Sequence, residues 1–249
     1  FIFFFSRSVK ALLIDEKGQV IKTAVPEYSF YTPKPLWAEA NPQDWWEATK
    51  VAIMQLTESI EPSQIAGIGL TGQMHGMVAL DKEGIVLRPC IMWNDQRSHL
   101  ECEEISSKVG SKKVLSITGN PVLSGFTAPK ILWTQKNEPE IFAQIDKVLL
   151  PKDFIRYKLT GEFFSDVSDA SGTSLLDVGK RTWSKEMLDA LGWPISWMPE
   201  VTESTEPTSK ISVEAAELTG LLAGTPVVAG GGDCAAPAVG SGIVEEGTV

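Results

Sequence analysis

A predicted antiparallel hairpin at the start of the chain, followed by a crossover helix, is the pattern that most constrains the fold. Residues 9–14 predict a strand, residues 15–18 a turn and residues 19–25 the returning strand. A capping residue and a proline at 41–42 then predict a helix over 45–59. A hairpin pairs its strands antiparallel, whereas a crossover helix can return the chain to a parallel neighbour. We therefore expect an α/β domain with a mixed sheet.

Further strands and helices are expected along the rest of the chain. Short apolar runs typical of strands recur at 65–70, 77–80, 85–87, 90–93 and 226–229. The middle third, residues 98–191, is more helical and less regular. No linker divides the sequence, so the simplest organisation is one domain over residues 1–249 with an inserted helical region.

Composition narrows the class of protein. The 249 residues carry a net charge of -10, whereas a surface that holds nucleic acid or an anionic membrane needs an excess of Lys and Arg. The apolar run from Phe1 to Phe5 is too short for a membrane span or a secretory signal. We therefore expect a cytoplasmic protein with no nucleic-acid or membrane partner. Cys90, Cys102 and Cys234 lie far apart, which argues against disulfides and a metal site.

The strongest local signal for a functional site lies near the end of the chain. A predicted strand at 226–229 leads into the glycine-rich tight turn at 230–233 and then into a short helix at 234–240. Glycines let the backbone approach a ligand closely, and the helix points free amide groups into the turn. Asp233, at this junction, is either a helix N-cap or a catalytic carboxylate, and the residues alone leave both interpretations open.

Two other polar clusters follow predicted strands. Gln73 and His75 would emerge after the strand at 65–70, where α/β sheets usually place ligand sites, although a single histidine is often structural. Residues 94–97 follow the strand at 90–93, and the alternative for them is a solvated turn with an ion pair. The glycine spacing matches neither GxGxxG nor a Walker A loop, so these residues indicate a polar ligand without naming a reaction.

A series of short segments carries a resemblance to a known family. They are LWAE at 36–39, WW at 45–46, GQMHG at 72–76, WNDQR at 93–97, GFTAPKILW at 125–133, LPKD at 150–153, SDASGT at 168–173 and GGGD at 230–233. In order and spacing these segments resemble the FGGY family of carbohydrate kinases, and within it the xylulokinases. The resemblance extends from residue 9 to the end of the chain.

The resemblance implies an actin-like ATPase fold of the ribonuclease H type, with two domains and an active site in the cleft between them. Residues 1–249 would be the N-terminal, sugar-binding domain, and the nucleotide-binding C-terminal domain would be absent from this chain. The implied reaction is phosphorylation of a ketose, D-xylulose, to D-xylulose 5-phosphate, with ATP and Mg²⁺ as cofactors. The chain alone would then be inactive.

The family's pattern also implies roles for particular residues. By position, Met74 and His75 match the pair that lines the ketose site, and Asp233 matches the catalytic base that accepts the proton of the sugar hydroxyl. Gln73 and Arg97 are further expected sugar contacts.

The first phosphate loop departs from the family's Asp-x-Gly-Thr pattern. Phe3 stands at the position of the acid, and Phe5 replaces a glycine whose missing side chain leaves room for phosphate. Phosphate and metal binding should be impaired by this change. Ser6, Ser8 and Lys10 are the expected ATP contacts in and beside this segment.

Cys234 is a second departure, because xylulokinases usually carry Asn after the base. A thiol is a poor substitute for the donor and acceptor of an amide, so one substrate hydrogen bond would be lost or moved. Cys234 is still an expected substrate contact.

Other functions stay open at this point. A glycerol kinase of the family would show Arg-Glu in place of Met74 and His75. Gluconokinases share the Met-His pair and are the closest rival, although Gln73 and residues 93–95 favour xylulose. The altered phosphate loop also allows a catalytically inactive sugar-binding homologue. The expected partner is a small-molecule sugar, and a homodimer is also considered.

Overall fold

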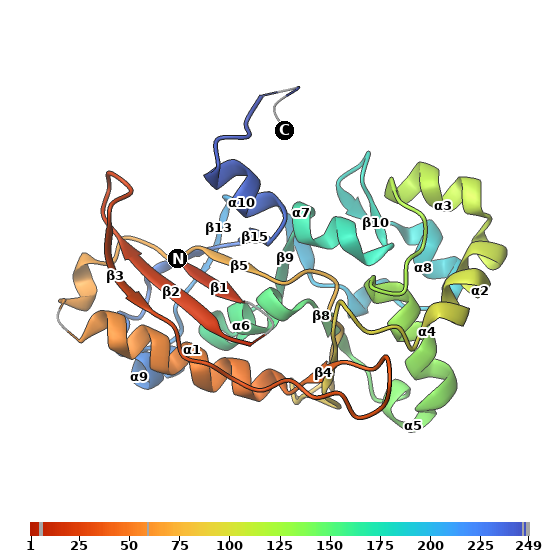
Figure 1. The fold of residues 1–249 in the computed structure, drawn as a ribbon, viewed down its shortest axis with the longest axis horizontal. Helices are drawn as coiled ribbons and strands as arrows, with labels where there is room; N and C mark the ends of the chain where they lie inside the picture. The colour runs from red at the N-terminus through yellow and green to blue at the C-terminus, as the bar shows by residue number, and fades with distance from the viewer. Residues whose placement is uncertain (5–6, 59, 246, 248–249) are drawn as a thin grey trace.

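A mixed five-stranded sheet organises one half of the molecule (Figure 1). The computed structural model describes residues 1–4, 7–58, 60–245 and 247. The strand order is β15 (Gly231–Gly232), β5 (Leu70–Gly72), β1 (Ile2–Phe4), β2 (Val9–Ile14) and β3 (Val20–Ala24). β15, β5 and β1 run parallel, whereas β1, β2 and β3 run antiparallel. The predicted α/β domain with a mixed sheet is confirmed.

Helices cover the sheet on one side and form a separate region beside it (Figure 1). α1 (Pro42–Thr57) packs against β2 and β3, and α6 (Pro151–Thr160) and α9 (Val213–Thr219) pack against α1. The other helices are α2 (His99–Val109), α3 (Ser111–Thr118), α4 (Thr127–Asn137), α5 (Pro139–Phe142), α7 (Val167–Ala170), α8 (Lys185–Leu191) and α10 (Ala235–Gly240). Short 3-10 helices are η1 (Pro62–Gln64), η2 (Ser171–Thr173) and η3 (Ile195–Trp197).

The remaining strands form two-stranded sheets. β4 (Glu39–Ala40) pairs with β7 (Cys90–Ile91), β6 (Val78–Leu80) with β8 (Lys147–Leu149), β9 (Phe164–Asp166) with β12 (Glu200–Thr202), β10 (Leu176–Asp177) with β11 (Thr182–Trp183), and β13 (Pro207–Lys210) with β14 (Pro226–Val228).

The opening hairpin and its helix form where local sequence signals predict them. The Asp15 side chain accepts hydrogen bonds from the backbone amides of Lys17 and Gln19, at 2.9 and 2.8 Å, and so fixes the turn between β2 and β3. Asn41 caps α1 by accepting from the Gln43 amide at 3.1 Å. The helix begins at Pro42, earlier than expected, because proline fits the first helical position.

Two hydrophobic cores meet at the strand β6. Val78 and Leu80 belong to the core between the sheet and α1, whereas Ala79 belongs to the core of the helical region. Side chains of a strand alternate between its two faces, so one strand can serve both cores. The helical region predicted over 98–191 is confirmed, with strands β8 to β11 within it.

Three expected elements differ in the structure. Residues 85–87, expected as a strand, make only an isolated antiparallel bridge between Val86 and Leu80. The strand predicted at 65–70 begins at Leu70 and runs on to Gly72, because the short strand β1 offers it partners only at those residues. The tight turn predicted at 230–233 is divided: Gly230 has φ +87°, the next two glycines form β15 beside β5, and the turn follows at Asp233 and Cys234. Among the described helices, none combines the length and the apolar character that crossing a membrane requires.

Candidate active site

The ends of two neighbouring parallel strands bring the main candidate residues together. Gly72 at the end of β5 lies opposite Gly232 at the end of β15. The backbone amide of Asp233 donates to the carbonyl oxygen of Gly72 at 3.0 Å. Asp233 therefore emerges beside the segment 73–75 at the carboxyl edge of the sheet, the usual position of a ligand site in such sheets.

Missing side chains at two glycines make room for the Met-His pair. A Cβ atom on Gly232 would lie 2.9 Å from Cγ and Sδ of Met74. A Cβ atom on Gly172 would lie 2.3 Å from Nδ1 of His75 and 3.0 Å from Cε of Met74. The two side chains thus occupy space that any other residue at these glycines would fill.

The imidazole of His75 is oriented by the backbone of Gly172 and by Phe126. Its Nδ1 lies 2.7 Å from the carbonyl oxygen of Gly172, and a carbonyl can only accept, so Nδ1 carries the proton. The ring of Phe126 stacks on the imidazole with centroids 4.6 Å apart. Burial lowers the pKa of His75, the Gly172 hydrogen bond opposes this change, and the charge of Lys130 adds to it. In the neutral ring, Nε2 is then the acceptor nitrogen.

Asp233 is not the N-cap of the helix that follows it. The N-cap of α10 is Cys234, and no side chain caps that helix through a hydrogen bond. The Asp233 side chain is half-buried, and this burial raises its pKa, while hydrogen bonds with the main chain at Met74 and at Asp233 itself oppose the rise. A carboxylate with a raised pKa suits proton acceptance.

A buried charge cluster lies behind the glycine loop. Lys152 Nζ is 2.5 Å from Asp153, 3.2 Å from Asp166 and 3.9 Å from Asp169, and all four side chains are fully buried. Since one ammonium faces three carboxylates, the cluster is short of positive charge. Burial, opposed by Lys152, raises the pKa of Asp169 well above its usual range, and the nearby carboxylates, including Asp233, raise it further.

This cluster holds the loop that carries Asp233. Lys152 Nζ donates to the carbonyl oxygen of Ala229 at 3.0 Å. Ser168 Oγ accepts from the Gly232 amide at 3.0 Å and donates to Asp166 at 2.5 Å. Sequence reasoning assigned no role to these residues. Their segments, LPKD and SDASGT, contributed to the resemblance and were the available signal.

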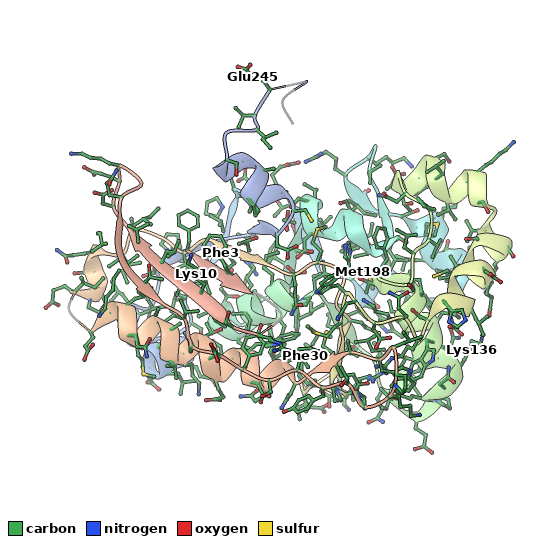
Figure 2. All side chains as sticks on the ribbon, in the orientation of Figure 1. Phe3, Lys10, Phe30, Lys136, Met198 and Glu245 are labelled. Atoms are coloured by element: carbon green, nitrogen blue, oxygen red, sulfur yellow. The ribbon has the colours of Figure 1, made fainter. Side chains whose placement is uncertain are left out.

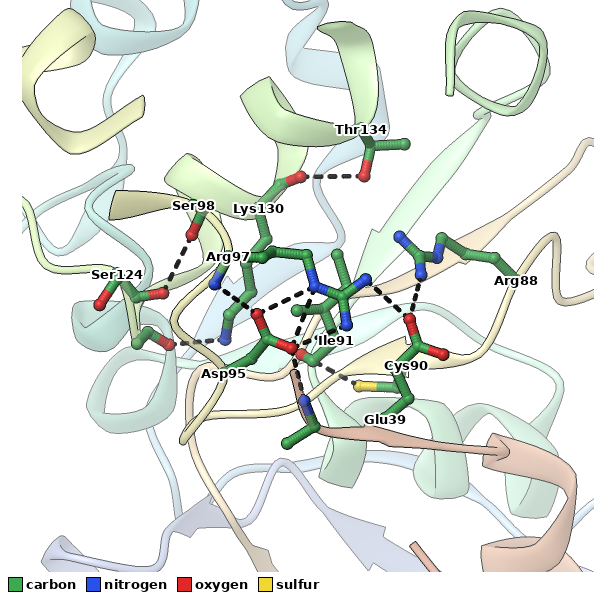
Figure 3. Close-up of polar contacts among 12 residues, drawn as sticks. Glu39, Arg88, Cys90, Ile91, Asp95, Arg97, Ser98, Ser124, Lys130 and Thr134 are labelled. Carbon is green, nitrogen blue, oxygen red and sulfur yellow. Dashed lines mark hydrogen bonds and ion pairs between the residues drawn. The ribbon is translucent and has the colours of Figure 1, made fainter. Parts of the chain in front are cut away.

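Arg97 is buried in a network of ion pairs, and its expected role as a sugar contact stays a prediction (Figure 3). Its side chain is only 1% exposed. Nε and Nη2 donate to Asp95, and Nη1 donates to Glu39 at 2.7 Å. The guanidinium also stacks over Trp37, 3.7 Å from the ring centroid. These contacts use three of the five N–H groups of the guanidinium.

Gln73 and Cys234 differ in their access to a ligand. Gln73 is 3% exposed, and among the described residues neither its amide oxygen nor its amide nitrogen has a hydrogen-bond partner. A buried amide without partners is costly, which is consistent with a site that a ligand completes. Cys234 is exposed as a whole residue. The partial burial of its thiol, together with the negative charge of Asp233, raises the pKa of that thiol.

The segment expected to contact ATP is partly described. Lys10 lies directly opposite Phe3 in the β1–β2 pair, so both side chains are on one face of the sheet (Figure 2). Ser8 forms an isolated bridge with Glu27. The expected contact Ser6, like Phe5, lies outside the described residues.

The described residues do not by themselves form a magnesium site. Phe3 offers no oxygen at the position where the family's pattern has an acid. Within the described part of the chain, no group of three or more His, Cys, Asp and Glu side chains is arranged to hold a metal ion.

Comparisons with known proteins find similar sugar kinases. The chain is 48% identical to the xylulose kinase of Escherichia coli strain K12 over 95% of this chain and 48% of that protein. It matches the structure of xylulose kinase from Rhodospirillum rubrum with a TM-score of 0.95 and 31% identity, covering 99% of this chain and 51% of that one. The gluconate kinase structure from Lactobacillus acidophilus matches with a TM-score of 0.86 and 26% identity, over 93% of this chain and 47% of that one.

The chain thus spans about half the length of the curated relatives it matches. A profile described as the FGGY family of carbohydrate kinases, N-terminal domain, matches residues 6–240, which is nearly the whole sequence. The fold is accordingly that of the actin-like ATPase domains in these kinases. On these grounds the chain belongs to the FGGY family of carbohydrate kinases and corresponds to its N-terminal domain.

Proposed function

We propose that this chain is the sugar-binding domain of an ATP-dependent ketose kinase, with D-xylulose as substrate and Asp233 as the general base. The observation that carries the proposal is that Asp233 and the Met74–His75 pair follow the ends of adjacent parallel strands, where the Asp233 carboxylate is hydrogen-bonded to the main chain at Met74. A nucleotide-binding domain beyond these 249 residues would complete the site.

The proposed chemistry uses the acceptor nitrogen of His75 and the carboxylate of Asp233. His75 Nε2 would accept a hydrogen bond from one sugar hydroxyl and so orient the substrate. The reacting hydroxyl would attack the terminal phosphorus of ATP, which supplies the phosphoryl group. As the new O–P bond forms and the bond to the leaving ADP breaks, Asp233 would accept the hydroxyl proton. Most of the remaining acceleration in such reactions comes from positioning.

The choice of D-xylulose is supported by relatives named xylulose kinases at 48% and 44% identity. A second candidate substrate is D-gluconate, because a gluconate kinase shares the fold and 26% of the sequence. Phe3 supports a third candidate, a sugar-binding protein without kinase activity.

The test joins this chain to the nucleotide-binding domain of a relative and measures ADP release with D-xylulose, D-gluconate and glycerol. We expect D-xylulose to give the highest kcat/KM. Asp233→Asn keeps the size of the side chain but accepts no proton, so it should lower kcat by about 10³-fold or more while leaving the sugar Kd within about threefold. Near-normal turnover by this variant would remove Asp233 from the role of base.

A further inference from the structure

The turn that presents His75 has a strained backbone. His75 has φ +72°, in the left-handed region that residues with a Cβ atom rarely adopt. The Gly76 amide donates to the carbonyl oxygen of Met74 at 2.9 Å. A hydrogen bond between residues two apart, around a residue with positive φ, describes the rare and strained form of the γ-turn. Such a conformation persists only when its surroundings hold it.

The carbonyl oxygen of His75 is held by two side chains of one helix. Lys130 Nζ donates to it at 2.8 Å and Thr127 Oγ1 at 3.1 Å (Figure 3 draws Lys130). Lys130 Nζ also donates to the carbonyl oxygen of Gly125 at 2.6 Å. The same segment supplies Phe126, which stacks on the imidazole. The start of α4 therefore fixes both the backbone and the ring of His75.

Lys130 is an unusual residue for its position. It is 0% exposed, burial lowers the pKa of its side chain to about 7, and among the described residues no carboxylate forms an ion pair with it. Its closest polar contacts are the two carbonyl oxygens. Burying an ammonium without a carboxylate partner is costly, and an apolar side chain would fill the space without that cost. Packing alone does not explain a lysine here.

We propose that Lys130 is a positioning residue of the sugar site, whose ammonium holds the carbonyl oxygen of His75 and thereby keeps the strained turn that presents the imidazole to the substrate. The inference rests on the proposed sugar-binding function. It assigns the contact to the backbone of His75, so the side chain of Lys130 need not touch the sugar.

The experiment compares Lys130→Met with Lys136→Met. Methionine keeps most of the buried stem but has no donor. Lys136 is on the same helix but pairs with Glu101 and Glu104, so its variant controls for the loss of one positive charge. The first measurement is the Kd for D-xylulose by titration calorimetry, with His75→Ala as the positive control.

The second measurement is independent of sugar binding. The sequence has two histidines, so His99→Gln leaves a single imidazole, and its ¹⁵N chemical shifts report the ring of His75. In that background we expect Lys130→Met to shift the imidazole signals and to weaken D-xylulose binding about tenfold, the scale of a lost hydrogen bond to a charged donor. Lys136→Met should change neither quantity, and Lys130→Arg should recover part of the affinity.

A folded Lys130→Met variant with unchanged His75 signals and unchanged affinity would overturn the inference. If this variant does not fold, Thr127→Val removes the second hydrogen bond to the same oxygen and should change both quantities in the same direction by a smaller amount; no change in either contradicts the proposal. If the unaltered chain binds no D-xylulose, the proposed function fails, and the imidazole signals still decide whether Lys130 holds the turn.

Discussion

The side chain of Asp233 is available for chemistry because the helix after it begins one residue later. The carboxylate of an N-capping aspartate would accept hydrogen bonds from the first backbone amides of α10, but the N-cap residue of this helix is Cys234. The tautomer of His75 is set in a comparable way, since the carbonyl oxygen of Gly172 accepts from Nδ1 and Nε2 becomes the acceptor nitrogen of the neutral ring. In both residues, the neighbouring backbone decides which atoms face a ligand.

The raised pKa of Asp233 leads to a prediction about pH. Burial disfavours the charged carboxylate, so its folded-state pKa lies above 3.8, and the base is lost by protonation as pH falls through that raised value. In the two-domain protein, kcat/KM for D-xylulose should therefore fall on the acid side with a midpoint above 3.8. A pH–rate profile with matched melting curves tests this expectation. A rate that stays constant until the protein itself unfolds would contradict it.

At the scale of elements, the site depends on how closely the loop before β15 approaches β5. A Cβ atom on Gly230 would lie 2.4 Å from the carbonyl oxygen of Leu70 and 3.0 Å from Cδ of Lys152. The buried cluster of Lys152, Asp153, Asp166 and Asp169 packs behind this contact and ties the loop to α6 and α7. The strand β15 consists of two glycines without side chains to pack, and it is held in place by hydrogen bonds with this charged cluster and with Ser168.

A pair of glycine variants separates the effect of this close approach from backbone strain. Gly230 has φ +87° and Gly224 has φ +90°, but a Cβ atom on Gly224 would meet nothing within 4 Å. We expect Gly224→Ala to lower the free energy of unfolding by about 1 kcal/mol, from the positive φ alone. Gly230→Ala should cost about 2 kcal/mol more, because backbone must move. Urea unfolding of both variants measures the difference, and equal losses would show that the contact with Leu70 is not limiting.

At the scale of the whole molecule, the candidate site lies at one edge of the sheet, and the chain spans about half the length of the curated relatives it matches. The segment before Val9 carries phenylalanines where the family's pattern has an acid and a glycine. We therefore expect both parts of the ATP site to limit activity: the altered loop and the domain that this chain does not include. Closure of two domains normally completes such a site and excludes water.

Four proteins test this expectation: the chain alone and the chain joined to a nucleotide-binding domain, each with and without Phe3→Asp and Phe5→Gly. The chain alone should bind D-xylulose weakly and release no ADP with either loop. Restoring the family's pattern with Phe3→Asp and Phe5→Gly should change the activity only of the two-domain proteins. There it should raise kcat/KM by about 10²-fold or more, because removing one electrostatic contact to the transferred group costs a factor of that size. Robust D-xylulose-dependent turnover by the unaltered chain alone would disprove this account.

The sequence by itself determined the elements that local signals specify. The hairpin of β2 and β3 follows from its turn residues, α1 from Asn41 and Pro42, and α10 from its position after the glycines. The same holds for the placement of His75 and Asp233 after strands, because strand ends in such sheets share one edge. These features depend on residues close together in the chain.

Only the tertiary structure decided which polar groups form hydrogen bonds with residues far away in the sequence. Glycines have little strand propensity, so the pairing of β15 exists only because β5 lies beside it. The guanidinium of Arg97 donates to Glu39, 58 positions away in the sequence. Lys130 reaches the carbonyl oxygen of His75 across 55 positions, and Lys152 reaches that of Ala229 across 77. No local pattern encodes such distant contacts, because they arise only when packing brings the segments together.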